Sequence, residues 1–217
     1  QTGKSVEAVI LYLACLRAGL VYLPLNTAYK AAEIEYFLGD ATPAIVVCDP
    51  ASITEIEAIA KKCGVRQVLS LDETGRGSLT EKADQQDSSL ETVARTGDDL
   101  AAILYTSGTT GRSKGAMLTH DNLASNARTL HQHWGFTEGD VLLHALPIFH
   151  VHGLFVALHC AFLNGSKVIL LRKFDPAVII ANLPKSTVFM GVPTFYVRLL
   201  AEAAFTKDVC RNMRLFT

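Results

Sequence analysis

Residues 100–115 read LAAILYTSGTTGRSKG, and this stretch governs how the rest of the chain is interpreted. Its first part, 100–104, is an apolar run with the length and composition of a buried strand. The run leads into a segment of glycine and hydroxyl residues that ends at Lys114. Glycines let backbone N–H groups converge on an anion, hydroxyls add donors, and lysine adds a mobile positive charge. The stretch therefore predicts a phosphate-binding loop, of the kind that holds a nucleotide.

This loop does not have the spacing of the NTPase P-loop. That motif needs four residues between its first glycine and Gly-Lys-Ser/Thr. Here Lys114 follows Ser113 and precedes Gly115, so both the spacing and the order differ. The plainer alternative is an exposed turn, but an exposed turn does not require so many hydroxyls and a lysine directly after a buried strand.

Single strands alternate with helices on both sides of the loop, which is typical of βαβ units in a parallel sheet. Helices are expected from their apolar spacing at 5–18, 31–38, 52–63, 121–133, 154–163, 176–182 and 193–204. Strands are expected at 20–25, 44–48, 65–71, 100–104, 141–145, 167–171, 187–190 and 214–216. The predicted fold class is therefore α/β, with two stacked parallel-sheet lobes.

A polar connector interrupts this alternation over residues 72–98. We expect it to separate a first α/β lobe, residues 1–98, from a second lobe, residues 99–217, that carries the phosphate loop. One helical turn is expected inside the connector, at residues 90–94.

Composition indicates a well-packed globular protein, with 49% hydrophobic and 19% charged residues. The formal net charge is −1, and no block of like charge gives an electrostatic footprint for nucleic acid. The uninterrupted apolar stretch from Val9 to Leu16 is too short to span a membrane. Five scattered cysteines without a C-x-x-C pair favour free buried thiols in a cytoplasmic protein over a disulfide framework or zinc site.

The loop and two later segments resemble one family. Residues 105–115 resemble the signature loop of the adenylate-forming acyl-CoA synthetases, which normally reads Y-T-S-G-T-T-G-x-P-K-G. Ser113 stands where proline is usual, a change expected to loosen the loop without removing a phosphate contact. Residues 146–153 resemble the next motif of the family, and residues 190–194 resemble its acyl-pocket segment. The resemblance covers the whole chain, as a fragment of the large N-terminal domain.

The resemblance implies an acid–CoA ligase that uses ATP, Mg²⁺ and coenzyme A with a small carboxylate. The carboxylate would attack the α-phosphate of ATP, and the coenzyme A thiol would then displace AMP. Thr106 would also contact the metal. The residues that would hold the β- and γ-phosphates are Thr106, Ser107, Gly108, Thr109, Thr110, Gly111 and Lys114.

Two histidines follow a predicted strand, in a loop position where side chains face a cleft. The resemblance places His150 at the junction of acyl group and adenylate, with a catalytic role. We interpret His152 as an ordinary core or surface histidine. Metal binding by the pair is not expected, because no carboxylate or cysteine accompanies them at ligand spacing.

Arg198 is the residue that bears most on the acid. It could form an i,i+4 pair with Glu202, although arginine before glutamate is the weaker order. Alternatively, its guanidinium binds a second carboxylate in an otherwise apolar acyl pocket, together with Gly191. With its flanking segment, Arg198 resembles the malonyl-CoA synthetases, so malonate or methylmalonate is expected. The alternatives are a short- or medium-chain fatty-acid or aryl-acid ligase, and a truncated, non-catalytic nucleotide-binding module.

The family's adenine-stacking segment with its magnesium-binding glutamate, the ribose aspartate and the catalytic lysine would lie beyond Thr217. Residues 1–217 alone are therefore expected to be inactive, or to bind polyphosphate only weakly.

Overall fold

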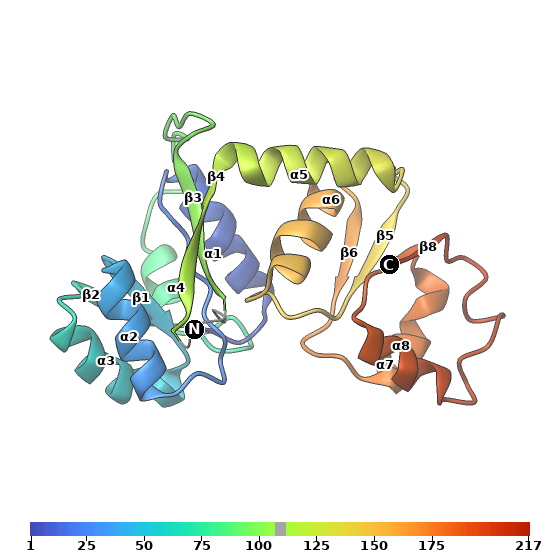
Figure 1. Cartoon of the computed structure of the whole chain (residues 1–217), viewed down its shortest axis with the longest axis horizontal. Helices are drawn as coiled ribbons and strands as arrows, with labels where there is room; N and C mark the ends of the chain where they lie inside the picture. The colour runs from blue at the N-terminus through green and yellow to red at the C-terminus, as the bar shows by residue number, and fades with distance from the viewer. Residues whose placement is uncertain (107–111) are drawn as a thin grey trace. The chain divides into compact units, whose positions relative to one another are not determined.

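The computed structural model describes residues 1–106 and 112–217 (Figure 1). The chain forms two compact units, Gln1–His120 and Asp121–Thr217. Helices alternate with parallel strands in both, so the predicted α/β class with parallel sheets is confirmed. Within the described residues, no helix is long and apolar enough to cross a bilayer.

The first unit is built around a βαβ arrangement. β1 and β2 pair in parallel, from Ile45 opposite Gln67 to Cys48 opposite Ser70, and α3 connects them. Apolar side chains of α2 and α3, including Ile34, Leu38 and Ile56, bury one face of this pair. The elements of the unit are α1 (Val6–Arg17), α2 (Ala31–Ala41), β1 (Ile45–Cys48), η1 (Pro50–Ser52), α3 (Ile53–Lys62), β2 (Gln67–Ser70), α4 (Ser78–Ala83), β3 (Leu100–Thr106) and β4 (Lys114–Thr119).

β3 and β4 form an antiparallel hairpin, drawn in green in Figure 1. The sequence predicts the first of these strands but not the second. β4 is largely exposed, and its residues show no clean alternation of buried and exposed side chains. The expected strand at 20–25 is reduced to one bridge, in which Tyr22 exchanges hydrogen bonds with Ala101 and Ile103 of β3. Pro24, which lacks an N–H, cannot extend that pairing.

The two units part after this hairpin, whereas the sequence predicts a boundary in the connector at 72–98. The difference has a physical origin in two contacts. The Arg17 guanidinium donates to the Leu90 carbonyl at 2.7 Å, and the Arg95 guanidinium donates to the Gly19 carbonyl at 2.7 Å. These bonds hold the connector on the end of α1. The helical turn expected at 90–94 is wrong, because the connector's helix is α4.

The second unit contains a four-stranded parallel sheet in the order β6-β5-β7-β8. Fully buried side chains such as Leu142, Leu143, Val188 and Phe189 come from its two central strands. The elements of this unit are α5 (His120–His133), β5 (Val141–His144), the π-helix η2 (His152–Ala157), α6 (Leu158–Phe162), β6 (Lys167–Leu170), α7 (Pro176–Asn182), η3 (Leu183–Lys185), β7 (Val188–Phe189), α8 (Pro193–Leu200) and β8 (Leu215–Phe216).

A charged cluster anchors β8 to this sheet. The Asp140 side chain is 2% exposed, and it accepts hydrogen bonds from Arg214 Nε at 2.7 Å and Thr187 Oγ1 at 2.7 Å. Its other oxygen accepts from the Thr137 N–H. Burial alone raises the pKa of a carboxyl, but the bonds from Arg214 and Thr187 outweigh it and hold the pKa of Asp140 well below its usual range.

Candidate functional site

The two ends of the predicted phosphate loop meet at the tip of the β3–β4 hairpin. Thr106 is the last residue of β3, Lys114 is the first of β4, and they stand opposite each other in the strand register. Both are exposed, so a hydroxyl and an ammonium group are presented together to solvent. The remaining predicted phosphate-binding residues lie outside the described residues: Ser107, Gly108, Thr109, Thr110 and Gly111.

Helix α2 lies beside this tip. The Tyr36 hydroxyl donates to the Ser113 carbonyl at 2.7 Å, and the Arg112 guanidinium lies 5.1 Å from the centre of the Tyr36 ring. On the other strand, the Tyr105 hydroxyl donates to Asp40 at 2.5 Å. Burial and the bond to Asp40 both raise the pKa of Tyr105, so its hydroxyl stays protonated and remains a donor.

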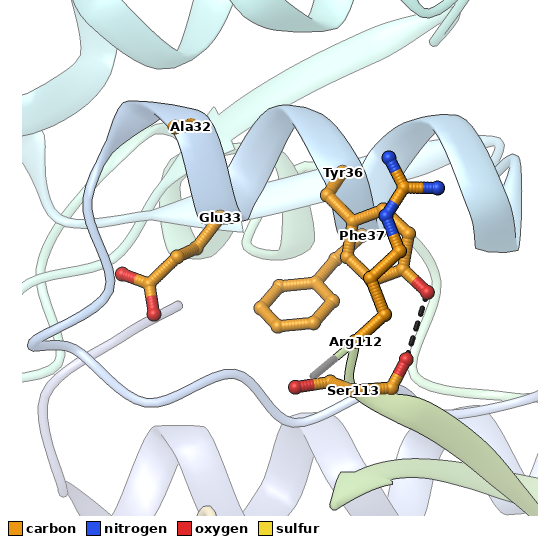
Figure 2. A pocket seen from close by; sticks show the side chains of 6 residues that line it. All are labelled: Ala32, Glu33, Tyr36, Phe37, Arg112 and Ser113. Carbon is orange, nitrogen blue, oxygen red and sulfur yellow. Dashed lines mark hydrogen bonds between the residues drawn. The ribbon is translucent and has the colours of Figure 1, made fainter. Parts of the chain in front are cut away.

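An open pocket of about 350 Å³ lies between α2 and the hairpin. Figure 2 shows the Glu33 carboxylate toward one end and Arg112 toward the other, with the dashed bond from Tyr36 to Ser113 between hairpin and helix. Glu33 also accepts a bond from the Lys30 N–H and so caps the start of α2. At the other end of the pocket, the Arg112 guanidinium gives the wall next to the loop a positive charge. The pocket is lined by Ala32, Glu33, Tyr36, Phe37, Arg112 and Ser113.

His150 lies in the second unit, in the turn between β5 and the π-helix η2. Its side chain is exposed, and its ring centre lies 4.7 Å from that of Phe149. Its carbonyl accepts from the Leu154 N–H at 3.0 Å. The imidazole is therefore accessible to a ligand while its backbone is fixed. His152 is half-buried, and burial lowers its pKa, which suits the interpretation as a neutral packing residue.

His144 organises the turn that presents His150, and it is not among the site residues predicted from the sequence. It ends β5, is 1% exposed, and its Nε2 lies 2.8 Å from the Gly153 carbonyl oxygen. A side chain at Gly153 would meet the Pro147 carbonyl oxygen at 2.1 Å, so the turn closes tightly on itself. The available signal was a histidine within the apolar strand just before the Leu146–Gly153 motif.

Arg198 lies on α8 over a pair of stacked aromatic rings. Its guanidinium is 4.8 Å from the centre of Phe174, which stacks on Phe195 with ring centres 3.9 Å apart. Within the described residues no carboxylate pairs with Arg198, so the alternative i,i+4 pair with Glu202 does not form. The side chain is exposed rather than enclosed in an apolar pocket. Its charge is available to an anion.

Gly191 is buried before the start of α8, and its N–H donates to the Thr217 carbonyl at 2.9 Å. An added Cβ would lie 3.2 Å from the rings of Phe189 and Tyr196. This close approach explains a glycine at the position by packing. Its role in substrate binding stays a prediction.

Residues 1–216 match the family described as AMP-binding enzyme. The chain belongs to the AMP-binding enzyme family. The resemblance to adenylate-forming acyl-CoA synthetases is thereby confirmed over the whole chain.

Relatives within this family share the fold closely. ATP-bound MatB from Rhodopseudomonas palustris is 58% identical with a TM-score of 0.97, covering 100% of this chain and 43% of that one. A malonyl-CoA ligase in a product complex with methylmalonyl-CoA and AMP is 29% identical with a TM-score of 0.77, covering 99% of this chain and 45% of that one. A mitochondrial malonate–CoA ligase from Mus musculus is 36% identical, covering 91% of this chain and 34% of its own length.

The chain thus spans about a third of the length of that curated relative. The structure brings Thr106 and Lys114 together in the first unit. His150, Gly191 and Arg198 all lie in the second unit, each close to the carboxyl end of a parallel strand or on the helix that follows it. Carboxyl ends of parallel strands are where ligands of open α/β sheets bind.

Proposed function

We propose that this chain belongs to an ATP-dependent, AMP-forming acid–CoA ligase whose acid is malonate or methylmalonate. The observation that carries the choice of acid is Arg198, an exposed guanidinium held over Phe174 without a carboxylate partner among the described residues. A planar guanidinium matches a carboxylate with two parallel hydrogen bonds. A monocarboxylic fatty acid has no second carboxylate for it to bind.

The relatives support this reaction, because they include a malonate–CoA ligase and a malonyl-CoA ligase in a complex with methylmalonyl-CoA and AMP. In the first step a carboxylate oxygen attacks the α-phosphorus of ATP, which forms an acyl-adenylate and releases pyrophosphate. In the second step the thiol of coenzyme A attacks the acyl carbon, and AMP leaves.

The residues of this chain contribute binding and charge to the first step. Lys114 and the adjacent Thr106 hydroxyl hold the β- and γ-phosphates, with the loop residues between them. Such charge neutralisation and positioning supply most of the catalysis in phosphate chemistry. His150, accessible in its turn, is proposed to contact the developing acyl-adenylate.

Magnesium would accompany the nucleotide and neutralise phosphate charge. The Thr106 hydroxyl fits this ion, because Mg²⁺ prefers oxygen ligands and takes few from the protein when phosphates are present. Within the described residues, no cluster of three or more histidine, cysteine, aspartate or glutamate side chains suits a separate metal site. We propose a cytoplasmic location, because five free thiols are typical of a protein in a reducing compartment.

Pyrophosphate release by the full-length protein tests this proposal, with malonate, methylmalonate, butyrate and benzoate as alternative acids. We expect malonate or methylmalonate to be preferred. Arg198→Ala should lower kcat/KM for malonate by about tenfold to a hundredfold, the effect of losing a charge-assisted hydrogen-bond pair. Arg211→Ala removes another exposed arginine of the same unit and should leave the rate unchanged.

Unchanged malonate turnover in Arg198→Ala would require the dicarboxylate assignment to be abandoned. Preference of the wild type for butyrate or benzoate would favour a fatty-acid or aryl-acid ligase. ATP binding without pyrophosphate release with any acid would favour a non-catalytic nucleotide-binding module.

A further inference from the structure

Helix α2 contacts the residues on both sides of the phosphate loop. The Asp40 carboxylate accepts a hydrogen bond from the hydroxyl of Tyr105, which lies one residue before the end of β3. The Tyr36 hydroxyl donates to the carbonyl of Ser113, which lies one residue before the start of β4. Tyr36 and Asp40 are four residues apart on the helix, so they share one face. A single helix therefore holds both strands of the hairpin at its tip.

Aromatic packing fixes the helix against the hairpin. The Tyr105 ring lies 4.4 Å from the ring of Phe37, which is 2% exposed and anchored in the unit's interior. Gly115 stands opposite Tyr105 in the register, and a Cβ there would lie 3.4 Å from the Tyr105 ring and 3.0 Å from Ile103. The tyrosine thus fits closely between the helix and the facing strand.

The negative charge of Asp40 does not stabilise α2. It lies in the last turn of α2, which ends at Ala41, where a negative charge opposes the helix dipole. Asp40 is exposed, and a hydrogen bond at such a position adds only about 1 kcal/mol to stability. The β3–β4 ladder already holds the two strands together without it. Its distinctive contribution is therefore local, in the placement of Tyr105 next to Thr106.

We propose that Tyr36 and Asp40 are positioning residues for nucleotide binding. By holding Ser113 and Tyr105, they fix the orientation of the neighbouring Lys114 and Thr106 toward the polyphosphate. Groups that bind phosphate are effective only when held close to the bound geometry. This inference rests on the proposed function, because it assumes that Lys114 and Thr106 contact ATP.

The test measures binding of Mg²⁺–ATP to the full-length protein by calorimetry, together with KM for ATP and KM for malonate. Tyr36→Phe and Asp40→Ala should each weaken ATP binding by about threefold to tenfold, the effect of losing one hydrogen bond. KM for ATP should rise by the same factor, and KM for malonate should stay unchanged. Tyr29→Phe is the matched control, because Tyr29 also packs on Phe37 but its hydroxyl makes no hydrogen bond within the described residues.

Wild-type ATP affinity in both Tyr36→Phe and Asp40→Ala would overturn the inference. A lower melting temperature with unchanged ATP binding would also overturn it, since the contacts would then be merely structural. Failure of the proposed function has a different signature: the wild type binds ATP, the two variants bind it more weakly, and no acid supports pyrophosphate release. Failure of the wild type to bind ATP would overturn both.

Discussion

Two glycines of this chain, Gly153 and Gly39, differ in how much space a side chain would have. At Gly153 a Cβ would overlap the Pro147 carbonyl oxygen, a backbone atom that cannot rotate away. At Gly39, inside α2, nothing lies within 4 Å of the added atom. The sequence shows the same residue type at both sites, and only the structure separates a required glycine from a replaceable one.

Alanine at these two glycines should therefore shift stability in opposite directions. Gly153→Ala should lower the free energy of unfolding by about 1–3 kcal/mol through overpacking. Gly39→Ala should raise it by about 0.5–1 kcal/mol, because alanine is the better helix former. Urea unfolding of the full-length protein measures both changes. Equal effects of the two substitutions would contradict the close approach at Gly153.

The short strand β8 is held in the sheet mainly by side-chain contacts next to it. It contributes two residues to the sheet, and the cluster of Asp140, Thr187 and Arg214 fixes the chain at its start. Asp140 precedes β5 and Arg214 precedes β8, so the ion pair joins segments that are distant in sequence. This pairing could not be predicted from local patterns.

Asp140→Asn should reduce stability at neutral pH by about 1–3 kcal/mol, since the bonds to Arg214 are charge-assisted. The pKa of Asp140 in the folded state lies below the ordinary value of 3.8. The contribution of the Asp140 carboxylate to folding stability is therefore fully present above pH 3.8. It is lost as the pH falls toward the folded-state pKa. Urea unfolding from neutral pH down to about pH 3 should show this loss in the wild type and a flatter profile in Asp140→Asn.

Asp208→Asn provides a control for this substitution, because Asp208 is exposed and, within the described residues, it accepts hydrogen bonds through its backbone carbonyl, from the N–H and the Nε of Arg211. Identical pH profiles for wild type and Asp140→Asn would show that the ion pair does not stabilise the sheet.

Elements with strong apolar periodicity were predictable from the sequence, and elements that depend on distant partners were not. α3 and β5 lie within a few residues of their expected bounds, because their own side chains specify period and burial. β4 was not predicted, because it pairs with β3 but has no alternation of apolar and polar residues of its own. The helix expected at 154–163 begins as a π-helix. Among site residues, Lys114 and Arg198 were evident as charges in unusual surroundings. Tyr36 and Asp40 were not, since their partners are far along the chain.

At the scale of the whole molecule, the chain has the fold of one segment of a larger enzyme architecture. It covers 43% of the chain of ATP-bound MatB with a TM-score of 0.97. Each of its two units has its own buried apolar side chains. Each unit therefore has a hydrophobic core of its own within the described residues.

We expect residues 1–217 alone to release no pyrophosphate with malonate and ATP. A chimera in which they replace the matching segment of MatB from Rhodopseudomonas palustris should retain activity, because the two segments are 58% identical. Pyrophosphate release by both proteins measures this, and circular dichroism confirms that each is folded. Turnover by the isolated chain, or a folded chimera without turnover, would contradict the expectation.

The contacts of α2 with the hairpin also bear on the order of folding. Tyr36 and Ser113 are separated by 77 positions along the chain, and Asp40 and Tyr105 by 65. Contacts between such distant residues form slowly, because the intervening chain must lose its conformational freedom first. During refolding, local helices should thus appear before the hairpin tip is set. Affinity for nucleotide should be among the last properties to return.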